Sequence, residues 1–323
     1  MIRAPASGRI GYFGKVPTRS DFIKAAQDIP VMDMLDNWMT QVMSLLPSDA
    51  RWKINYDALA PVSFAFVGPR RKHAIAGHLV ASSDQSGRRY PFLMMRAIEV
   101  ADPAMFVSRC PMVLDPLWGR MEVLARDLLD AQEPAPQLQA IPETMVALDE
   151  QSGNALGAFL ATGTVSSLGA LLCRADVRHL ILALGLLLQP VMQSGAADLH
   201  KSLVLPLPLN AGARHAVAAF WLELIAPFLG RADFELALFI TCIEHKPVLV
   251  VGFSGAAAQT LHAIIDPLAA REQQVSFADT DWVDEQVGID VDVRALASYL
   301  DQPQLPLKLA RELFLQTFIG VTT

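Results

Sequence analysis

The stretch from Gly11 to Phe22 combines residues that could do chemistry with residues that restrict the backbone. It reads Gly-Tyr-Phe-Gly-Lys-Val-Pro-Thr-Arg-Ser-Asp-Phe. Gly14-Lys15 after an expected strand is compatible with a phosphate-binding loop, which requires Gly-x4-Gly-Lys-Ser/Thr followed by a helix. Arg9 occupies the position of the first glycine, and Val16 the position of the hydroxyl residue. We therefore predict a structured turn here, shaped by glycine and proline, and not a nucleotide site.

A second candidate is the segment Gly252-Phe253-Ser254-Gly255-Ala256, between an expected strand and an expected helix. It resembles a nucleophile elbow with alanine in place of the last glycine. A serine nucleophile needs a histidine base oriented by a carboxylate, and in that fold both follow the serine. Only His262 follows Ser254, with no acid between them. A serine hydrolase using Ser254 remains an alternative function, and a β–α turn is the favoured interpretation.

The residues that commonly bind metals show no ligand spacing. The seven histidines form no HExxH motif, and the three cysteines, at positions 110, 173 and 242, are far apart, which argues against a zinc site and a disulfide framework. The acids Asp279, Asp281, Asp284 and Glu285 cluster without the glycine and spacing of an EF-hand. They predict a solvated acidic loop, and we expect no metal and no cofactor.

Composition restricts the function classes further. Hydrophobic residues make up 52% of the 323 residues and charged residues 18%, so a sizeable core is expected. The formal charge of −7 divides into +5 over the first 100 residues and −12 over the rest. This basic part lacks interleaved aromatic residues, which argues against binding to nucleic acid.

The most apolar run, Leu180 to Leu188, has nine residues, whereas a helix that spans a bilayer needs about 20. It predicts a buried helix, and with no apolar leader at the N-terminus we expect a cytoplasmic protein without membrane insertion.

Hydrophobic periodicity predicts the elements that must position these residues. Strands are expected at 9–14, 62–67, 73–82, 90–98, 203–207, 234–241 and 247–252. Helices are expected at 33–46, from Pro103 to about 129 with Asp102 as N-cap, within 156–192, and at 213–229, 256–268, 294–300 and 307–318. The proline-rich stretch 130–142 predicts a linker or surface excursion, and 272–292 an irregular acidic segment.

Strands covered by helices indicate an α/β fold, which we expect to be a layered α-β-α sandwich with a mixed sheet and helical additions. We interpret residues 8–323 as one domain. It comprises an N-terminal half (8–130), a helical insert at about 143–200, and a C-terminal half (201–323).

Two charged loops could meet in that fold. Lys15, Arg19 and Asp21 lie in the first, and the turn from Asp84 to Arg89 contributes Arg88 and Arg89. A carboxylate and an arginine from the two loops could pair, for example Asp21 with Arg88, which would fix the loop geometry. Alternatively, the same charges present a protein-binding surface, to which the basic residues Arg70, Arg71 and Lys72 could contribute.

The Gly11–Phe22 stretch resembles the N-terminal signature of the TagF family, accessory proteins of bacterial type VI secretion. Trp38 falls where that family carries a helical tryptophan, and Asp84 with Gly87-Arg88-Arg89-Tyr90-Pro91-Phe92 resembles a second family segment. The strong resemblance covers about residues 10–130, and a weaker one continues through 205–207, 220–222 and 234–239. Ser20 replaces the usual glycine, which would cause strain if that position requires a positive φ.

The resemblance implies a layered α/β fold, no established catalytic activity and a role in post-translational regulation. It implies a negative regulator of secretion that engages the forkhead-associated scaffold protein of the system, in a circuit with a kinase and a phosphatase. A structural adaptor of the secretion machine is the other non-enzymatic alternative. The candidate signature or partner-binding residues are Gly11, Phe13, Gly14, Lys15, Pro17, Arg19, Asp21, Phe22, Trp38, Asp84, Gly87, Arg88, Tyr90 and Pro91.

Overall fold

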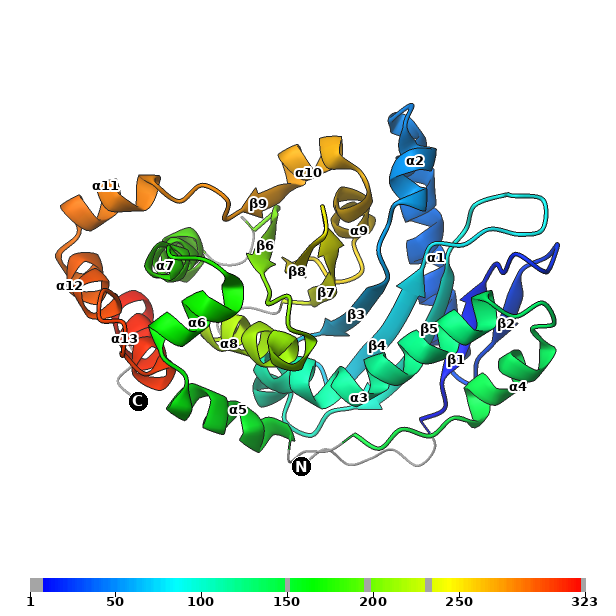
Figure 1. Cartoon of the computed structure of the whole chain (residues 1–323), viewed down its shortest axis with the longest axis horizontal. Helices are drawn as coiled ribbons and strands as arrows, with labels where there is room; N and C mark the ends of the chain where they lie inside the picture. Colours follow the sequence, from blue (N-terminus) through cyan, green and yellow to red (C-terminus); the bar gives the residue numbers. More distant parts are fainter. Residues whose placement is uncertain (1–7, 149–151, 195–198, 230–233, 321–323) are drawn as a thin grey trace.

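A nine-stranded sheet runs through the molecule in the order β2-β1-β5-β4-β3-β7-β8-β6-β9 (Figure 1). The computed structural model describes residues 8–148, 152–194, 199–229 and 234–320. The strands are β1 (Gly11–Gly14), β2 (Ile23–Ala25), β3 (Val62–Val67), β4 (His73–Val80), β5 (Phe92–Glu99), β6 (Ser202–Pro206), β7 (Leu236–Ile243), β8 (Lys246–Gly252) and β9 (Gln274–Ser276).

The sheet is mixed, because β6 and β9 pair in parallel while the other neighbours are antiparallel. Strands from both halves of the chain share it. They meet where β3 pairs with β7, from Ser63 opposite Ile240 to Val67 opposite Leu236. The three-residue strands β2 and β9 form the two edges. The halves are therefore joined by continuous backbone hydrogen bonding.

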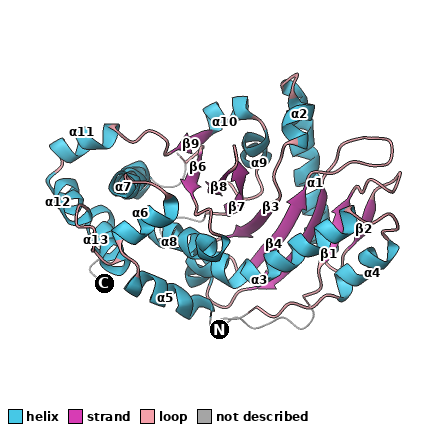
Figure 2. Cartoon of the chain, in the orientation of Figure 1, coloured by secondary structure: helices cyan, strands magenta, loops and turns pink. Residues whose placement is uncertain are grey.

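Helices cover both faces of this sheet (Figure 2). They are α1 (Ile29–Leu45), α2 (Trp52–Asp57), α3 (Pro103–Leu129), α4 (Ala135–Glu143), α5 (Ser152–Thr162), α6 (Val165–Leu172), α7 (Val177–Ser194), α8 (Ala211–Leu229), α9 (Ala258–Ile265), α10 (Pro267–Gln273), α11 (Trp282–Ile289), α12 (Val291–Leu300) and α13 (Leu307–Ile319), with a short 3₁₀ turn, η1 (Leu46–Ser48).

Side-chain alternation along the strands divides the interior into two cores. On β3, Phe64 and Phe66 face the core formed with α1, α2 and α9, whereas Ala65 and Val67 face the larger core formed with α3, α7, α8 and α13. The sheet thus lies between two helical layers. This arrangement confirms the predicted α-β-α sandwich with a mixed sheet.

Most element predictions are confirmed, and the errors have local causes. β3 has the predicted bounds, and the Asp102 side chain accepts from Met105 N as the N-cap of α3. Of the two alternatives for 130–142, the linker is wrong, since α4 occupies most of the stretch, while its largely exposed residues fit a surface excursion. The segment 272–292, predicted to be irregular, contains β9 and α11. The single helix predicted at 256–268 is two helices, because Asp266 caps α10 and Pro267 begins it.

The apolar run 180–188 lies inside α7, where its leucines are buried against neighbouring helices. In the part of the chain that the structure describes, no helix combines the length and hydropathy needed to cross a bilayer. Because α7 packs on α8 and α13, it contributes directly to the larger core. The division into two halves with an insert at about 143–200 remains a prediction.

Candidate functional site

The signature turn lies beside the β4–β5 loop because β1 and β5 are antiparallel neighbours. Gly14 pairs with Phe92, so the residues after β1 and those before β5 leave the same end of the sheet. Gly14 has φ of 130°, and a Cβ there would lie 2.1 Å from the carbonyl oxygen of Pro91. Only glycine fits this close approach. The local backbone thus brings Lys15 against the loop that contains Asp84.

Lys15, Asp84 and Arg88 form a largely buried ion cluster. Lys15 Nζ donates to Asp84 Oδ2 at 2.9 Å, and Arg88 Nε donates to the same oxygen at 2.6 Å. The second oxygen, Oδ1, accepts from the backbone amides of Ser86 (2.9 Å) and Arg88 (3.0 Å). Asp84 is fully enclosed, whereas the Arg88 side chain is mostly exposed. The cluster therefore holds the two loops in one geometry.

The electrostatics of Asp84 follow from these contacts. Burial taken alone raises the pKa of a carboxyl group, and this is the largest single effect at Asp84. The hydrogen bonds from Lys15, Arg88 and the loop amides act in the opposite direction, and together they hold the pKa of Asp84 well below its usual range. Asp84 is therefore ionised wherever the protein is folded at neutral pH. Such a buried, fully bonded charge specifies geometry more than it adds stability.

Above the cluster, Phe22 is held by two aromatic contacts while much of its side chain faces solvent. Lys15 Nζ lies 5.0 Å from the centroid of its ring, and the ring of Tyr90 meets it edge-on at 4.7 Å. The Tyr90 hydroxyl in turn donates to Asp36 Oδ1 on α1 at 3.0 Å. Phe22 is nevertheless 54% exposed. The turn thus presents a positioned aromatic side chain on the surface.

Further residues support this arrangement, and of these the sequence did not indicate Ser82, Tyr56 or Asp57. Ser82 Oγ donates to the carbonyl of Lys15 at 2.8 Å, and the Tyr56 hydroxyl bonds both backbone groups of Ser82. Arg89 forms a two-contact ion pair with Asp57 on α2. No local pattern marks these partners, because each contact joins segments at least 26 positions apart.

The predicted site residues divide into buried and exposed sets. Those with a structural role are Gly11, Phe13, Gly14, Lys15, Trp38, Asp84, Tyr90 and Pro91, all of which are buried. Gly87 has φ of 75° in the loop turn, and the Trp38 ring packs among Phe64, Phe66 and Phe239. The exposed set is Pro17, Arg19, Asp21, Phe22, Gly87 and Arg88. The buried residues of the signature therefore shape the turn, and the exposed residues lie on its surface.

The suggested pairing of Asp21 with Arg88 is wrong. Arg88 bonds Asp84 in its own loop and reaches the first loop through the carbonyl of Ser20, which accepts from Arg88 Nη2 at 3.0 Å. Lys15 makes the charged contact between the loops. Ser20 itself is not among the described non-glycine residues with positive φ. Serine therefore causes no left-handed strain at this position.

The basic hairpin turn does not adjoin this surface. Arg70, Arg71 and Lys72 precede β4, whereas the Asp84 loop follows it, so the two segments leave opposite ends of an eight-residue strand. At about 3.3 Å per residue this separates them by roughly 25 Å. Arg71 pairs there with Glu235 at 3.0 Å. The two basic segments cannot form one compact binding patch.

Ser254 lies at the same end as this hairpin turn. It is exposed, and no histidine among the described residues forms a hydrogen bond with it. His262 is buried about one turn into α9, where its Nε2 lies 3.5 Å from Asp266 Oδ2. The histidine and carboxylate lie near each other, but the serine is not joined to them.

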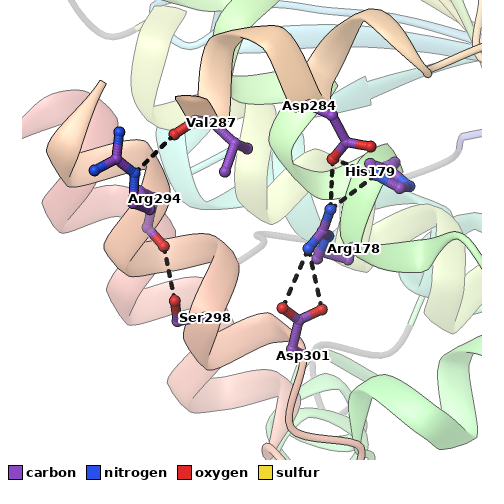
Figure 3. Close-up of polar contacts among 7 residues, drawn as sticks. All are labelled: Arg178, His179, Asp284, Val287, Arg294, Ser298 and Asp301. Carbon is purple, nitrogen blue, oxygen red and sulfur yellow. Dashed lines mark hydrogen bonds and ion pairs between the residues drawn. The ribbon is translucent and has the colours of Figure 1, made fainter. Parts of the chain in front are cut away.

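Of the four predicted acids near residue 284, Asp284 is engaged in ion pairs (Figure 3). Asp284 on α11 accepts from Arg178 Nη2 at 2.6 Å and lies 3.0 Å from His179 Nε2, and Arg178 also contacts Asp301. The four acids are exposed as predicted, but Asp284 lies in a helix and not in a loop, and its ion pairs join α11 to α7. Within the described ranges, no group of three or more histidine, cysteine or acidic residues is arranged to hold a metal ion.

No curated protein matches the chain. Solved structures that match include the crystal structure of PA0076 from Pseudomonas aeruginosa PAO1. It is 20% identical over 43% of this chain and 63% of that chain, with a TM-score of 0.37. The chain thus spans a little less than two thirds of that protein.

A family model matches residues 11–145 and describes the TagF N-terminal domain, type VI secretion system-associated. The matched region contains β1 to β5, the signature turn and the ion cluster, so the geometry above lies within it. Residues 11–145 are therefore a TagF N-terminal domain, the type VI secretion system-associated domain that the family model describes.

Proposed function

We propose that the protein represses type VI secretion without catalysis, by binding the forkhead-associated scaffold protein of the secretion machine through its signature turn. The matched TagF N-terminal domain supports the association with type VI secretion. The observation that carries the binding role is Phe22, an aromatic side chain that is half-exposed yet held by Lys15 and Tyr90.

Phe22 has the properties of an interface anchor. Aromatic and arginine side chains dominate binding energy at interfaces, and an already ordered side chain loses little entropy on binding. Arg19, Asp21 and Arg88 surround the turn with exposed charges. Neither Arg19 nor Asp21 makes an ion pair with another described residue. The turn therefore offers an apolar centre with a charged rim, the usual organisation of a protein-binding patch.

The ion cluster supplies the rigidity that this role needs. Lys15 simultaneously bonds Asp84 and lies against the Phe22 ring. Gln85 N donates to the carbonyl of Arg19 at 2.9 Å, so the exposed loop is tied to its neighbour by backbone as well as by charge. In this proposal the buried residues of the signature preserve the shape of the surface, and the exposed ones contact the partner.

The test measures binding of the purified full chain to the purified scaffold protein by calorimetry. We expect Phe22→Ala to weaken the complex by at least about tenfold, the effect of an anchor residue. Ile289→Ala is the matched control, since Ile289 is 75% exposed on α11, far from the turn. Equal affinities for wild type and Phe22→Ala would disprove the proposed surface, and an absence of any complex would disprove the proposed partner.

Secretion assays then distinguish repression from the adaptor alternative. If the protein is a repressor, deletion of its gene raises secretion and the Phe22→Ala variant fails to restore the lower level. Loss of an adaptor lowers secretion instead. The hydrolase alternative is tested separately with a fluorophosphonate probe, which would label the wild type and not Ser254→Ala if Ser254 is a nucleophile.

A further inference from the structure

A cleft of about 350 Å³ lies at the end of the sheet opposite the signature turn. Its lining includes His200 and Lys201 before β6, Gly252 at the end of β8, Ser254 just after that strand, and Thr260 in α9. Gly252 pairs with Ala237 and so lies at the same end of the sheet as Val67, whereas the ion cluster lies beyond Val80. The cleft is thus separate from the surface proposed to bind the scaffold protein.

The first turn of α9 opens into this cleft. The N-cap is Ala257, which has no side-chain group to accept from the helix amides. The backbone amides of the next residues, Ala258 and Gln259, donate to no described residue. Free amides at a helix N-terminus carry partial positive charge and favour an anion. Since Ala257 and Gln259 line the cleft, these amides lie at its wall.

A second observation points independently to a ligand. Thr260 lines the cleft although the residue is only 8% exposed, and its hydroxyl has no hydrogen-bond partner among the described residues. Gly252 makes room for this hydroxyl, because a Cβ at that position would lie 2.8 Å from Thr260 Oγ1. A hydroxyl that borders a cleft and has no protein partner can donate to a bound group. The adjacent Ser254 hydroxyl is exposed.

The charges in and near the cleft favour one anionic group. Lys201 is exposed and makes no ion pair with a described residue, and His200 stands beside it. The turn that contains Ser254 is tied to the basic hairpin, because Gly255 N donates to the carbonyl of Glu235, whose side chain pairs with Arg71. Glu272 also lines the cleft and would repel a second negative group. A polyanion such as nucleic acid is therefore disfavoured.

We propose that this cleft binds the phosphate group of a small phosphate monoester. The α9 amides and the hydroxyls of Thr260 and Ser254 donate to the phosphate oxygens, and the Lys201 ammonium neutralises the charge. Glu272 accepts from a hydroxyl of the remainder of the ligand. This binding needs neither the scaffold protein nor catalysis at Ser254, and it adds a ligand site to the chain.

The test titrates the full-length protein with inorganic phosphate and with glycerol 3-phosphate, at constant ionic strength, by calorimetry. We expect saturable binding of both, with the ester bound more tightly because Glu272 and the rest of the cleft contact its hydroxyls. Lys201→Met should weaken binding about tenfold or more, since it removes a charge-assisted hydrogen bond. Thr260→Val, which keeps the shape, should weaken it severalfold.

Lys246→Met is the matched control, because Lys246 is an exposed lysine at the opposite end of β8. It should bind phosphate like the wild type. Absence of saturable binding would overturn the proposal. Equal weakening by Lys201→Met and Lys246→Met would also overturn it, because that result would indicate a general effect of net charge and not a specific site. Tight binding of a phosphoserine peptide with no binding of the small ester would also overturn it. All these variants leave Phe22 intact, so failure here does not affect the scaffold-binding proposal.

Discussion

His78 shows how a single buried residue links this fold to pH. It lies in β4 facing the α3 layer, is 2% exposed, and its Nδ1 lies 3.1 Å from Ser63 Oγ. Its Nε2 is buried without a hydrogen-bond partner. Burial disfavours the charged ring and lowers the pKa of His78 to about 4. The histidine is therefore neutral in the native protein at physiological pH.

The folded protein should lose stability as the pH falls. Between about pH 6.5 and pH 4 the unfolded state binds a proton at His78 that the folded state does not, so the free energy of unfolding decreases as the pH falls through this window. The decrease attributable to His78 should reach roughly 3 kcal/mol. Urea unfolding across this range measures it. His78→Gln should flatten the pH dependence of the free energy of unfolding. The control His200→Gln, at an exposed site, should leave it unchanged. An unchanged slope in His78→Gln would show that this dependence does not come from His78.

At the scale of elements, ion pairs and hydrogen bonds connect the outer helix α11 to its neighbours. Arg178 at the start of α7 reaches Asp284 on α11 and Asp301 just after α12 (Figure 3). Arg294 on α12 donates to the carbonyls of Val287 and Gly288 near the end of α11. Among its residues, α11 buries only Val283. A short helix with so little buried surface depends on its contacts with neighbouring elements, here the side chains of Arg178 and Arg294.

Arg178→Met should loosen α11 without unfolding the molecule. Each partly exposed ion pair contributes at most about 1 kcal/mol, so the global free energy of unfolding should fall by roughly 1–2 kcal/mol. Amide hydrogen exchange should accelerate over α11 and the start of α12 while β3 to β5 keep their protection. Arg126→Met, at an exposed position on α3, is the control. Unchanged exchange in α11 would show that these ion pairs do not hold the helix.

At the scale of the whole molecule, one aromatic cluster joins the two halves of the chain. Trp38 from α1 and Phe64 from β3 contact Phe239 from β7, with ring centroids 6.2 and 6.5 Å from that of Phe239. The cluster lies over the β3–β7 junction, where the sheet is continuous. The C-terminal half therefore completes the core of the family-matched region, which is why we interpret the chain as one domain.

Phe239→Ala should destabilise the entire protein by about 3–5 kcal/mol, because it removes a fully buried ring and leaves a cavity. If the halves form one cooperative unit, tryptophan fluorescence and circular dichroism should report the same transition in the variant as in the wild type. Leu209→Ala, at an exposed site, should cost less than about 0.5 kcal/mol. Two separated transitions would contradict the single-domain interpretation.

Much of the fold and part of the site could be predicted because their signals are local. Alternation identified β3 and its neighbours, the Asp102-Pro103 pair marked the start of α3, and the Gly11–Phe22 stretch indicated both the turn and the family. The segments containing α4 and α11 were predicted incorrectly. Prolines and acids dominate their composition, while tertiary contacts make them helical.

The sequence by itself determined that residues 11–22 form a special turn, that strands alternate with helices, and that two charged loops are candidates for contact. Only the tertiary structure decided that Lys15 bonds Asp84, that Asp21 remains on the surface, and that Arg70–Lys72 lies at the other end of β4. The physical reason is that capping, alternation and turn chemistry act over a few residues. A contact across 69 positions instead depends on the register of β1 against β5, which packing of the whole sheet sets.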